Sequence, residues 1–234
     1  MIKNLTSVIL AIFFCDLARA EFNFTTCPAS HEIMAEKVAK TFDMNKFVGT
    51  YYEQALHDYT QYPTCPRVSC IRSQKEFTDA GDGKSQIKDT FTLGCFGHAY
   101  TFPYYFNTTE VNGSLDGFIL NAPVWWKVLF QLEYPDTIVD FKESEDGGQY
   151  EWVIEFQCRQ KDKLFKQGQK IGFTGFNFYT RDQNPGDDVF EEMKQAATDA
   201  GLDVYFNHWP GLIRVPQDDC DYDNEKSWFR PLTN

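Results

Sequence analysis

At the stretch Phe42-Asp-Met-Asn-Lys-Phe-Val-Gly-Thr-Tyr-Tyr52, the residue pattern of the chain changes from helical to β-type. Upstream of it, Cys27 and a short helical pattern at 31–40 form a lead-in segment. Within it, the turn-forming residues 43–46 precede an aromatic-rich run at 47–56, which is typical of a β-strand. We therefore expect sheet structure to begin here and to continue toward the C-terminus.

Short runs of β-type residues follow this stretch at regular spacing. They are 68–77, 86–93, 98–106, 117–120, 125–132, 136–142, 150–159 and 172–180. Glycine-containing turns at 79–84 and 146–148 indicate hairpins between neighbouring runs. About eight short strands with such turns predict a β-sandwich or a β-barrel.

The hydrophobic period changes after these strands. Apolar residues at 187–200 recur at three- and four-residue steps between Pro185 and Gly201, which predicts one helix. The segment 202–209 is compatible with one more strand. An eight-stranded closed sheet encloses room for one small ligand. We therefore predict an all-β fold: an eight-stranded antiparallel up-and-down barrel at about 47–180, one C-terminal helix packed outside it, and no more than three helices in all.

The first twenty residues have the features of a secretory signal peptide. A short apolar run at 8–14 and the small-x-small sequence Ala18-Arg-Ala20 predict cleavage before Glu21. The remaining 214 of the 234 residues have a length common for one all-β domain, so we expect a single domain at 21–234. Three glycosylation sequons agree with passage through a secretory pathway: Asn23, Asn107 and Asn112.

Six cysteines lie beyond the signal peptide: Cys27, Cys65, Cys70, Cys95, Cys158 and Cys220. An even number in a secreted chain favours three disulfides over metal ligands. The sequence by itself permits about 15 pairings of six cysteines. The four histidines show no metal-ligand spacing, so we expect neither a metal nor another cofactor.

The charge and the apolar content limit the classes of partner. A net charge of −12 argues against nucleic acid, whose phosphates require a basic surface. No second apolar stretch is long enough to span a bilayer, so we expect no integral membrane segment. Aromatic residues make up 17% of the chain and either fill a core or line a cavity. The oligomeric state does not follow from these features.

Five segments, in this order and spacing, resemble the motifs of lipocalins, especially the branch of apolipoprotein D and the bilin-binding proteins. They are Cys27-Pro28, Phe42 to Tyr52, Val139 to Phe141, Tyr150 to Cys158 and Phe178-Tyr-Thr-Arg181. The first signature block of that family reads approximately F-D-x-x-K-Y-x-G-x-W-Y-E. This chain departs from it at Tyr51, which stands where the family has tryptophan. The resemblance implies one lipocalin domain.

The resemblance also implies roles for particular residues. Gly49, Tyr51 and Arg181 would close the barrel floor, with the guanidinium lying over the tyrosine ring in a contact of about 0.5–2 kcal/mol. By analogy with apolipoprotein D, three disulfides are implied: Cys27–Cys158, Cys70–Cys220 and, from the two cysteines left over, Cys65–Cys95. Cys65 and Cys70 are only five residues apart. An exchanged pairing, in which Cys65 bonds to Cys220 and Cys70 to Cys95, is therefore an alternative.

The expected function is that of a secreted, extracellular carrier for a small hydrophobic ligand, such as a retinoid, carotenoid, sterol or fatty acid. Removal of apolar surface from water would drive binding, and a few polar groups would orient the ligand. Strand alternation suggests these candidates for the cavity wall: Tyr100, Phe102, Phe118, Trp126, Trp152, Ile154, Phe176 and Phe178.

Two other functions compete with the carrier. The stretch from Tyr150 to Arg181 also resembles the lipocalin domain of violaxanthin de-epoxidases, which use acidic residues on a bound carotenoid. Of the two acids in that family, one position falls on Ser69 here, and Asp136 matches the other within one residue. We therefore expect no enzyme and no catalytic residue, although a buried carboxyl of raised pKa would favour one. The third possibility is a structural barrel filled by its own aromatic side chains.

Overall fold

The turn-forming residues 43–46 fold into a single helical turn, and the first strand starts directly after it. In this computed structural model the Asp43 carboxylate caps α4 (Met44–Phe47) by accepting a hydrogen bond from the Asn45 backbone N–H at 2.8 Å. The structure describes residues 27–58, 65, 67–79, 85–96, 98–118, 133–160, 171–207, 211–220, 222 and 225–227. The expected signal peptide, Asn23 and the run at 125–132 lie outside these residues.

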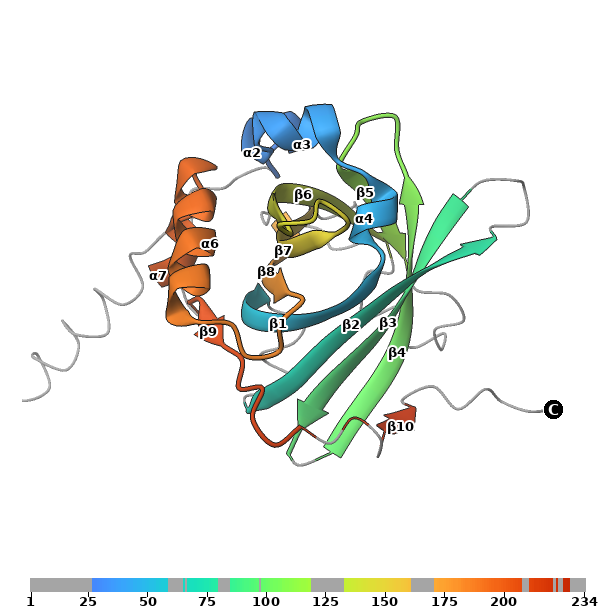
Figure 1. Cartoon of the computed structure of the whole chain (residues 1–234), viewed down its shortest axis with the longest axis vertical. Helices are drawn as coiled ribbons and strands as arrows, with labels where there is room; N and C mark the ends of the chain where they lie inside the picture. Colours follow the sequence, from blue (N-terminus) through green and yellow to red (C-terminus); the bar gives the residue numbers. More distant parts are fainter. Residues whose placement is uncertain are drawn as a thin grey trace, which may run out of the picture.

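Eight strands form a closed antiparallel barrel (Figure 1). Their bounds are Gly49–Asp58 (β1), Val68–Asp79 (β2), Ser85–Cys95 (β3), His98–Thr108 (β4), Ser114–Phe118 (β5), Glu133–Glu143 (β6), Tyr150–Gln160 (β7) and Ile171–Thr180 (β8). Each strand pairs with the next along the chain, and β1 pairs with β8, which closes the sheet. The predicted fold class is confirmed.

The described part of the chain contains five helical segments, which is more than the three expected. They are α2 (Ser30–Ile33), α3 (Glu36–Thr41), α4, α6 (Asp187–Asp199) and α7 (Val204–Asn207). The helix expected at 31–40 is broken into α2 and α3 because the Ala35 N–H donates to the Val139 carbonyl of β6 at 2.8 Å. Among these segments only α6 is longer than six residues, so the all-β class is unchanged.

The segment after α6 also differs from the expectation. Part of the strand expected at 202–209 is the helical turn α7, because Leu202, Tyr205 and Phe206 fall on one side at three- and four-residue steps and pack together against the barrel. Two short strands follow it. β9 (Ile213–Arg214) pairs with β1, and β10 (Glu225–Ser227) pairs in parallel with β4.

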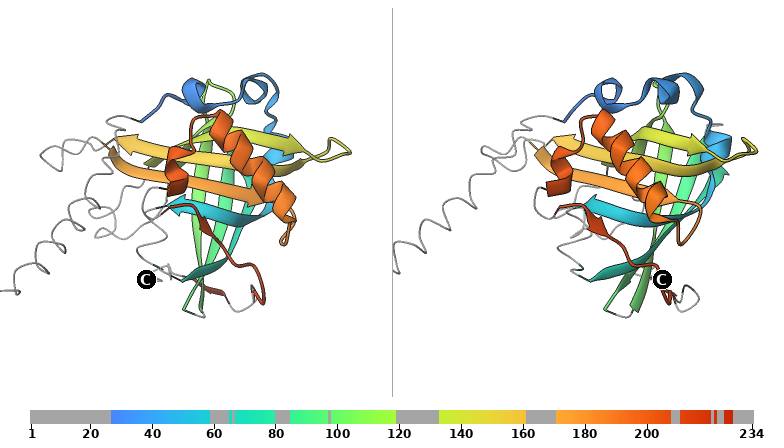
Figure 2. Two further views of the ribbon diagram at one scale, coloured as in Figure 1. Left: turned by 90° about the vertical axis from the view of Figure 1, so that its left-hand side faces the viewer. Right: turned by 60° about the vertical axis from the view of Figure 1, so that its left-hand side comes forward.

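The buried apolar side chains form two clusters on opposite faces of the barrel wall. The inner cluster includes Tyr51, Phe91, Phe106 and Val153, and it continues to Phe47 of α4. The outer cluster joins the wall to α6 and α7, and Figure 2 shows α6 lying across the neighbouring strands β7 and β8. Its members include Trp152, Ile154, Phe156, Phe176, Phe178, Met193, Ala197 and Tyr205.

Arg181, directly after β8, holds one end of the barrel together. Its guanidinium donates hydrogen bonds to the backbone carbonyls of four residues: Lys46, Val48, Thr50 and Tyr150. The guanidinium carbon also lies 3.8 Å from the centre of the Tyr51 ring. Gly49 has a φ of +114°, and a Cβ at this position would overlap the Arg181 side chain. Three separate segments therefore meet at Arg181, which is the arrangement that the lipocalin resemblance implied.

Three disulfides join segments that are far apart in the sequence. They are Cys27–Cys158, Cys65–Cys95 and Cys70–Cys220. These pairs coincide with those implied by the resemblance. The first attaches the lead-in segment to β7, and the third attaches the C-terminal segment to β2.

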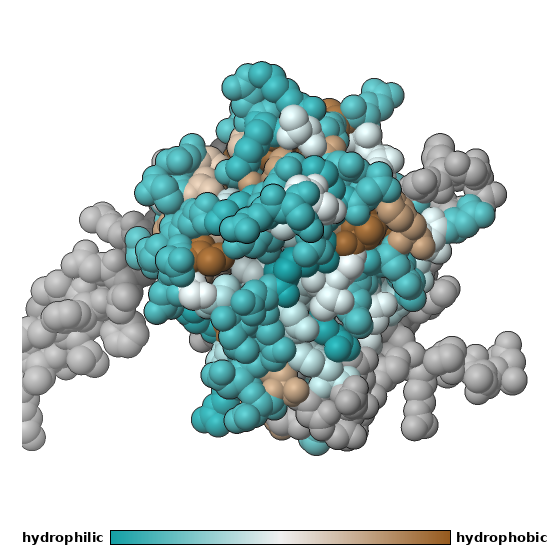
Figure 3. All heavy atoms as spheres, viewed as in Figure 1, coloured by the Kyte–Doolittle hydropathy of each residue, from teal (hydrophilic) through white to brown (hydrophobic). Residues whose placement is uncertain are grey.

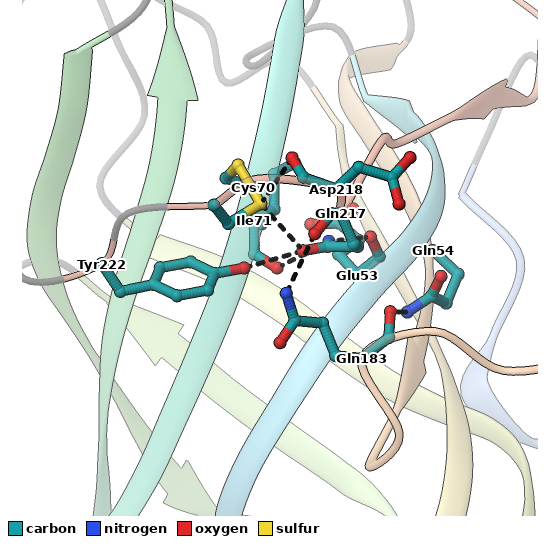
Figure 4. Close-up of a disulfide and its surroundings, with 9 residues drawn as sticks. Glu53, Gln54, Cys70, Ile71, Gln183, Gln217, Asp218 and Tyr222 are labelled. Atoms are coloured by element: carbon teal, nitrogen blue, oxygen red, sulfur yellow. Dashed lines mark hydrogen bonds between the residues drawn. A yellow bond between two sulfur atoms is a disulfide. The ribbon is translucent and has the colours of Figure 1, made fainter.

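Hydrogen bonds around Gln217 also hold the C-terminal segment beside the disulfide (Figure 4). The Gln217 side-chain amide donates to the Glu53 carbonyl at 2.8 Å and to the Ile71 carbonyl at 3.0 Å. Its carbonyl oxygen accepts from the Tyr222 hydroxyl at 2.7 Å, while Gln183 donates to the Gln217 backbone at 2.9 Å. The segment is therefore bound to β1 and β2 by polar contacts as well as by the Cys70–Cys220 bond.

One face of the molecule is mainly polar. The face in Figure 3 carries mostly hydrophilic residues, with apolar residues only in small separate patches. Three large apolar side chains are exposed in the described ranges: Phe77, Phe96 and Val111. Across those same ranges, no helix combines the length and the apolar character needed to cross a membrane.

Candidate functional site

Buried charged side chains meet inside the barrel. Lys75 on β2 lies 3.3 Å from the Glu155 carboxylate on β7. In the sheet, β1 and β8 separate these two strands, so a contact between them has to cross the interior. We call six residues on five strands the interior polar cluster: Ser73, Lys75, Asp89, Asp136, Glu155 and Asn177.

Strand pairing connects these residues to one another. Lys75 is opposite Asp89 in the β2–β3 ladder, and Asn177 is opposite Glu155 in the β7–β8 ladder. Directly opposite residues project from the same face of a sheet. The Lys75 ammonium donates to Asp89 at 2.8 Å and to the Ser73 hydroxyl at 2.7 Å, and Ser73 in turn donates to Asp89 at 2.7 Å. All six side chains are buried.

Aromatic rings surround the Lys75 ammonium. Its nitrogen lies 5.0 Å from the ring centre of Tyr179, 5.1 Å from that of Phe47 and 5.6 Å from that of Phe106. Ring faces attract cations through their quadrupole. Burial by itself lowers the pKa of Lys75, but the charges of Asp89 and Glu155 outweigh burial and raise this pKa above its ordinary value. Lys75 therefore remains charged inside the barrel.

Two carboxyl groups of the cluster titrate abnormally. Burial, followed by the charge of Glu155, raises the pKa of Asp136 well above its ordinary value. Burial also raises the pKa of Glu155, while Lys75 and a hydrogen bond with Asp136 act in the opposite direction. Glu155 is the one of the two that lies beside the Lys75 ammonium, and the charge of Lys75 is the main influence opposing the rise in its pKa.

Solved structures provide the comparison with known proteins. Apocrustacyanin C2 matches with a TM-score of 0.56 and 17% identity over 85% of this chain and 92% of that one. Lobster apocrustacyanin A1 matches with a TM-score of 0.54 and 16% identity over 85% and 92%. H1 crustacyanin from the lobster Homarus americanus matches with a TM-score of 0.55 and 14% identity over 85% and 91%.

These crustacyanins are lipocalins, and the match to apocrustacyanin C2 covers 85% of this chain. The chain has the lipocalin fold. Neither a family model nor a curated protein matches it, so the likeness is one of structure. The closed up-and-down barrel with α6 outside it and the Arg181 contact with Tyr51 are the parts of the lipocalin fold that the sequence motifs predicted.

The eight residues predicted to line a lipocalin cavity divide into three groups. Two of them, Tyr100 and Phe102 on β4, face the interior: Phe102 is opposite Phe91 of the inner cluster, with ring centres 5.3 Å apart. Trp126 lies outside the described residues. Four belong instead to the outer cluster, which joins the wall to α6 and α7: Trp152, Ile154, Phe176 and Phe178. The eighth, Phe118, also faces outward.

The residues assigned to the wrong face have one physical cause in common: successive side chains of a strand point to opposite faces of the sheet. Phe178 packs against Phe190 of α6 at 5.7 Å between ring centres, so its neighbour Asn177 faces the interior. Phe118 stacks on Tyr105 at 5.9 Å, and that ring is opposite Lys88, which pairs with exposed Glu76 on the outer surface. The apolar face of β7 and β8 was assigned to the cavity, but it is the face that α6 covers.

The interior polar cluster was missed for the same reason. Glu155 alternates with apolar residues in the predicted strand 150–159, and such alternation is typical of a strand with one face in solvent. In the structure the residues from Trp152 to Phe156 are all buried, because the barrel encloses one face and α6 covers the other. The sequence did contain one indication of this arrangement. The helix predicted at 187–200 had to cover one face of the barrel wall, so that face could not line the cavity.

Replacing Asp136 by asparagine should make the fold progressively more stable than that of wild type as the pH rises. The pKa of Asp136 is higher in the folded than in the unfolded chain, so the folded state binds more protons above the ordinary value of 3.8. From there up to the raised pKa, this group lowers the free energy of unfolding by up to about 1.4 kcal/mol per pH unit. The Asp136→Asn variant has no carboxyl at this position, so it does not lose this stability as the pH rises.

Urea unfolding of both proteins between about pH 4 and pH 8 measures the difference. Asp116→Asn on β5 is the control, because this aspartate is exposed. A difference between Asp136→Asn and wild type that stays constant over the whole pH range would contradict a raised pKa for Asp136.

Proposed function

We propose that this protein is a secreted carrier that binds one small hydrophobic ligand inside its barrel. The observation that carries this proposal is the aromatic wall formed by β3 and β4. Phe91, Phe102 and Tyr104 contact one another on the inward face, with ring centres 5.2 to 5.8 Å apart. Phe102 and Tyr104 are only partly buried, so part of their surface is accessible to a ligand. Burial of such surface contributes about 25 cal/mol per Å².

The comparisons and the disulfides support the same proposal. The neighbours with this fold include proteins described as apoproteins, a word for the protein part of a complex with a removable group. Three disulfides favour an oxidising compartment. The proposal includes a signal peptide at 1–20, a mature single domain at 21–234 and glycosylation at Asn23, Asn107 and Asn112. Asn107 and Asn112 are exposed, which permits glycosylation.

Titration of the purified protein with retinol or a long-chain fatty acid should quench tryptophan fluorescence and saturate near one equivalent. Phe102→Ala should weaken binding about tenfold, because each 1.4 kcal/mol of lost apolar contact is a factor of ten. Tyr105→Ala on the same strand is the matched control, since its ring stacks on Phe118 at the outer face. The absence of a saturable response across a panel of lipophiles would favour a barrel filled by its own side chains.

One observation favours the second candidate, an enzyme that acts on a bound polyene. Asp136 is a buried inward-facing carboxyl, and burial raises its pKa, as a general acid requires. Its acidic neighbour is Glu155 on β7, whereas Ser69 occupies the other position of the de-epoxidase pair. Wild type and Asp136→Asn can be incubated with violaxanthin and an added two-electron reductant. A product formed by wild type alone would support the enzyme, and recovery of unchanged pigment would support the carrier.

A further inference from the structure

We propose that the interior polar cluster binds a protonated primary amine at the end of an apolar ligand, so that the carrier's natural ligands are amphiphilic amines. This inference rests on the proposed carrier function and specifies its ligand class. Four observations carry it: unpartnered acceptors, an excess of acidic groups, aromatic rings around a cation, and an adjacent apolar wall.

The first observation is a set of buried acceptor atoms. One side-chain oxygen on each of Asp89 and Asn177 makes no hydrogen bond within the described structure, and these side chains are at most 3% exposed. They come from two strands, β3 and β8. A buried acceptor without a donor costs about 1–3 kcal/mol. A primary ammonium brings three N–H donors and no acceptor, which is the complement of this set.

The second observation is the charge balance. Lys75 is the one cation of the interior polar cluster, and it faces the carboxylates of both Asp89 and Glu155. The cluster therefore contains three buried carboxyl groups and a single cation. A buried uncompensated charge is costly, so a ligand cation is favoured and a ligand carboxylate is disfavoured. This balance separates amines from the fatty acids that an apolar cavity alone would accept.

The third and fourth observations concern the surroundings of the cluster. The rings of Phe47, Phe106 and Tyr179 already face the Lys75 ammonium, so this region suits alkylammonium groups. The inward ring of Tyr104 is opposite Asp89 in the β3–β4 ladder and continues toward Phe102. An amine bound at the cluster would therefore have its apolar body along the aromatic wall.

The test uses four ligands with the same twelve-carbon tail: dodecylamine, dodecan-1-ol, dodecanoic acid and dodecyltrimethylammonium. Each competes with bound retinol, below the concentration at which it forms micelles. We expect dodecylamine to bind about tenfold more tightly than dodecan-1-ol, and dodecanoic acid to bind most weakly. Dodecyltrimethylammonium has the charge but no N–H group, so it should bind more weakly than dodecylamine.

Glu155→Gln should reduce the ratio of amine to alcohol affinity toward one. Glu151→Gln on the same strand is the matched control, because this carboxylate pairs with Lys142 on the outer surface and should keep the wild-type ratio. The wild-type series decides the proposal if Glu155→Gln does not fold.

Each outcome has a defined meaning. Equal affinity for the amine and the alcohol, or tighter binding of the acid, would overturn the amine proposal while the carrier function stands. Equal affinity for dodecylamine and dodecyltrimethylammonium would assign the preference to the net negative charge of the protein, and would also overturn it. If neither retinol nor any member of the series binds, the carrier function itself is wrong.

Discussion

Lys75→Met is expected to destabilise the fold by about 3–5 kcal/mol, because it leaves the buried carboxylates of Asp89 and Glu155 without their cation. Methionine is close to lysine in length, so the packing against Phe47 is largely kept and the loss is electrostatic. Urea unfolding at neutral pH measures the change. The variant lacks the Lys75 charge that lowers the pKa of Glu155, so Glu155 takes up a proton more readily in the folded state and the loss of stability should become smaller as the pH falls.

Lys88→Met is the matched control for this prediction. Lys88 lies on the adjacent strand β3 and pairs with Glu76 at 2.7 Å on the outer surface. An exposed pair of this kind contributes about 0–1 kcal/mol. Combining Lys75→Met with Asp89→Asn and Glu155→Gln should restore much of the stability, because no uncompensated charge is then left. Equal losses for Lys75→Met and Lys88→Met would contradict the buried position of Lys75.

Removal of the Cys70–Cys220 disulfide by the double change to alanine is expected to cost about 5 kcal/mol in the chain-entropy model. The bond joins residues 150 apart, so it strongly restricts the unfolded chain. Removal of Cys65–Cys95, which joins residues 30 apart, should cost about 1.5 kcal/mol less in the same model. Urea unfolding of the two double variants measures the difference, and a larger loss for the shorter loop would contradict the entropic origin.

Hydrogen exchange separates this effect from loosening of the C-terminal segment. The Cys70 N–H donates to the Pro216 carbonyl at 2.8 Å, and the Val215 N–H donates to the Gln54 carbonyl at 3.0 Å. Gln217 adds side-chain hydrogen bonds to β1 and β2. We therefore expect the Val215 amide to stay protected in the Cys70→Ala/Cys220→Ala variant. Exchange of this amide at the rate of the unfolded chain would mean that the disulfide alone holds the segment.

The sequence predicted the order of strands because each is bounded by turn residues and has a simple local pattern. The lipocalin resemblance added long-range information that local patterns lack, such as the contact between Arg181 and Tyr51. Which side chains of each strand point into the barrel could not be obtained in this way. Phe178 and Glu155 are both buried, so neither hydrophobicity nor polarity indicated which residue faces the interior.

The position of the charged residues depends on contacts across the barrel, which have no signature in a single strand. Lys75 has acidic partners on β3 and β7, 14 and 80 residues further along the chain. In the sequence Lys75-Glu-Phe has the composition of an exposed strand end. Only the closed sheet brings these groups together and excludes water from them.

The strands β7 and β8 carry two separate clusters on their two faces, and this has a consequence for how the protein can change over generations. In the proposed carrier, substitutions at Glu155 or Asn177 would alter the chemistry presented to a ligand, while Ile154 and Phe178 would continue to hold α6 in place. A duplicated gene could therefore acquire a different ligand through a few inward substitutions. The outward residues, in contrast, pack against α6, so substitutions there would loosen the helix. Divergence among descendants should thus be concentrated at alternate positions of the same strands.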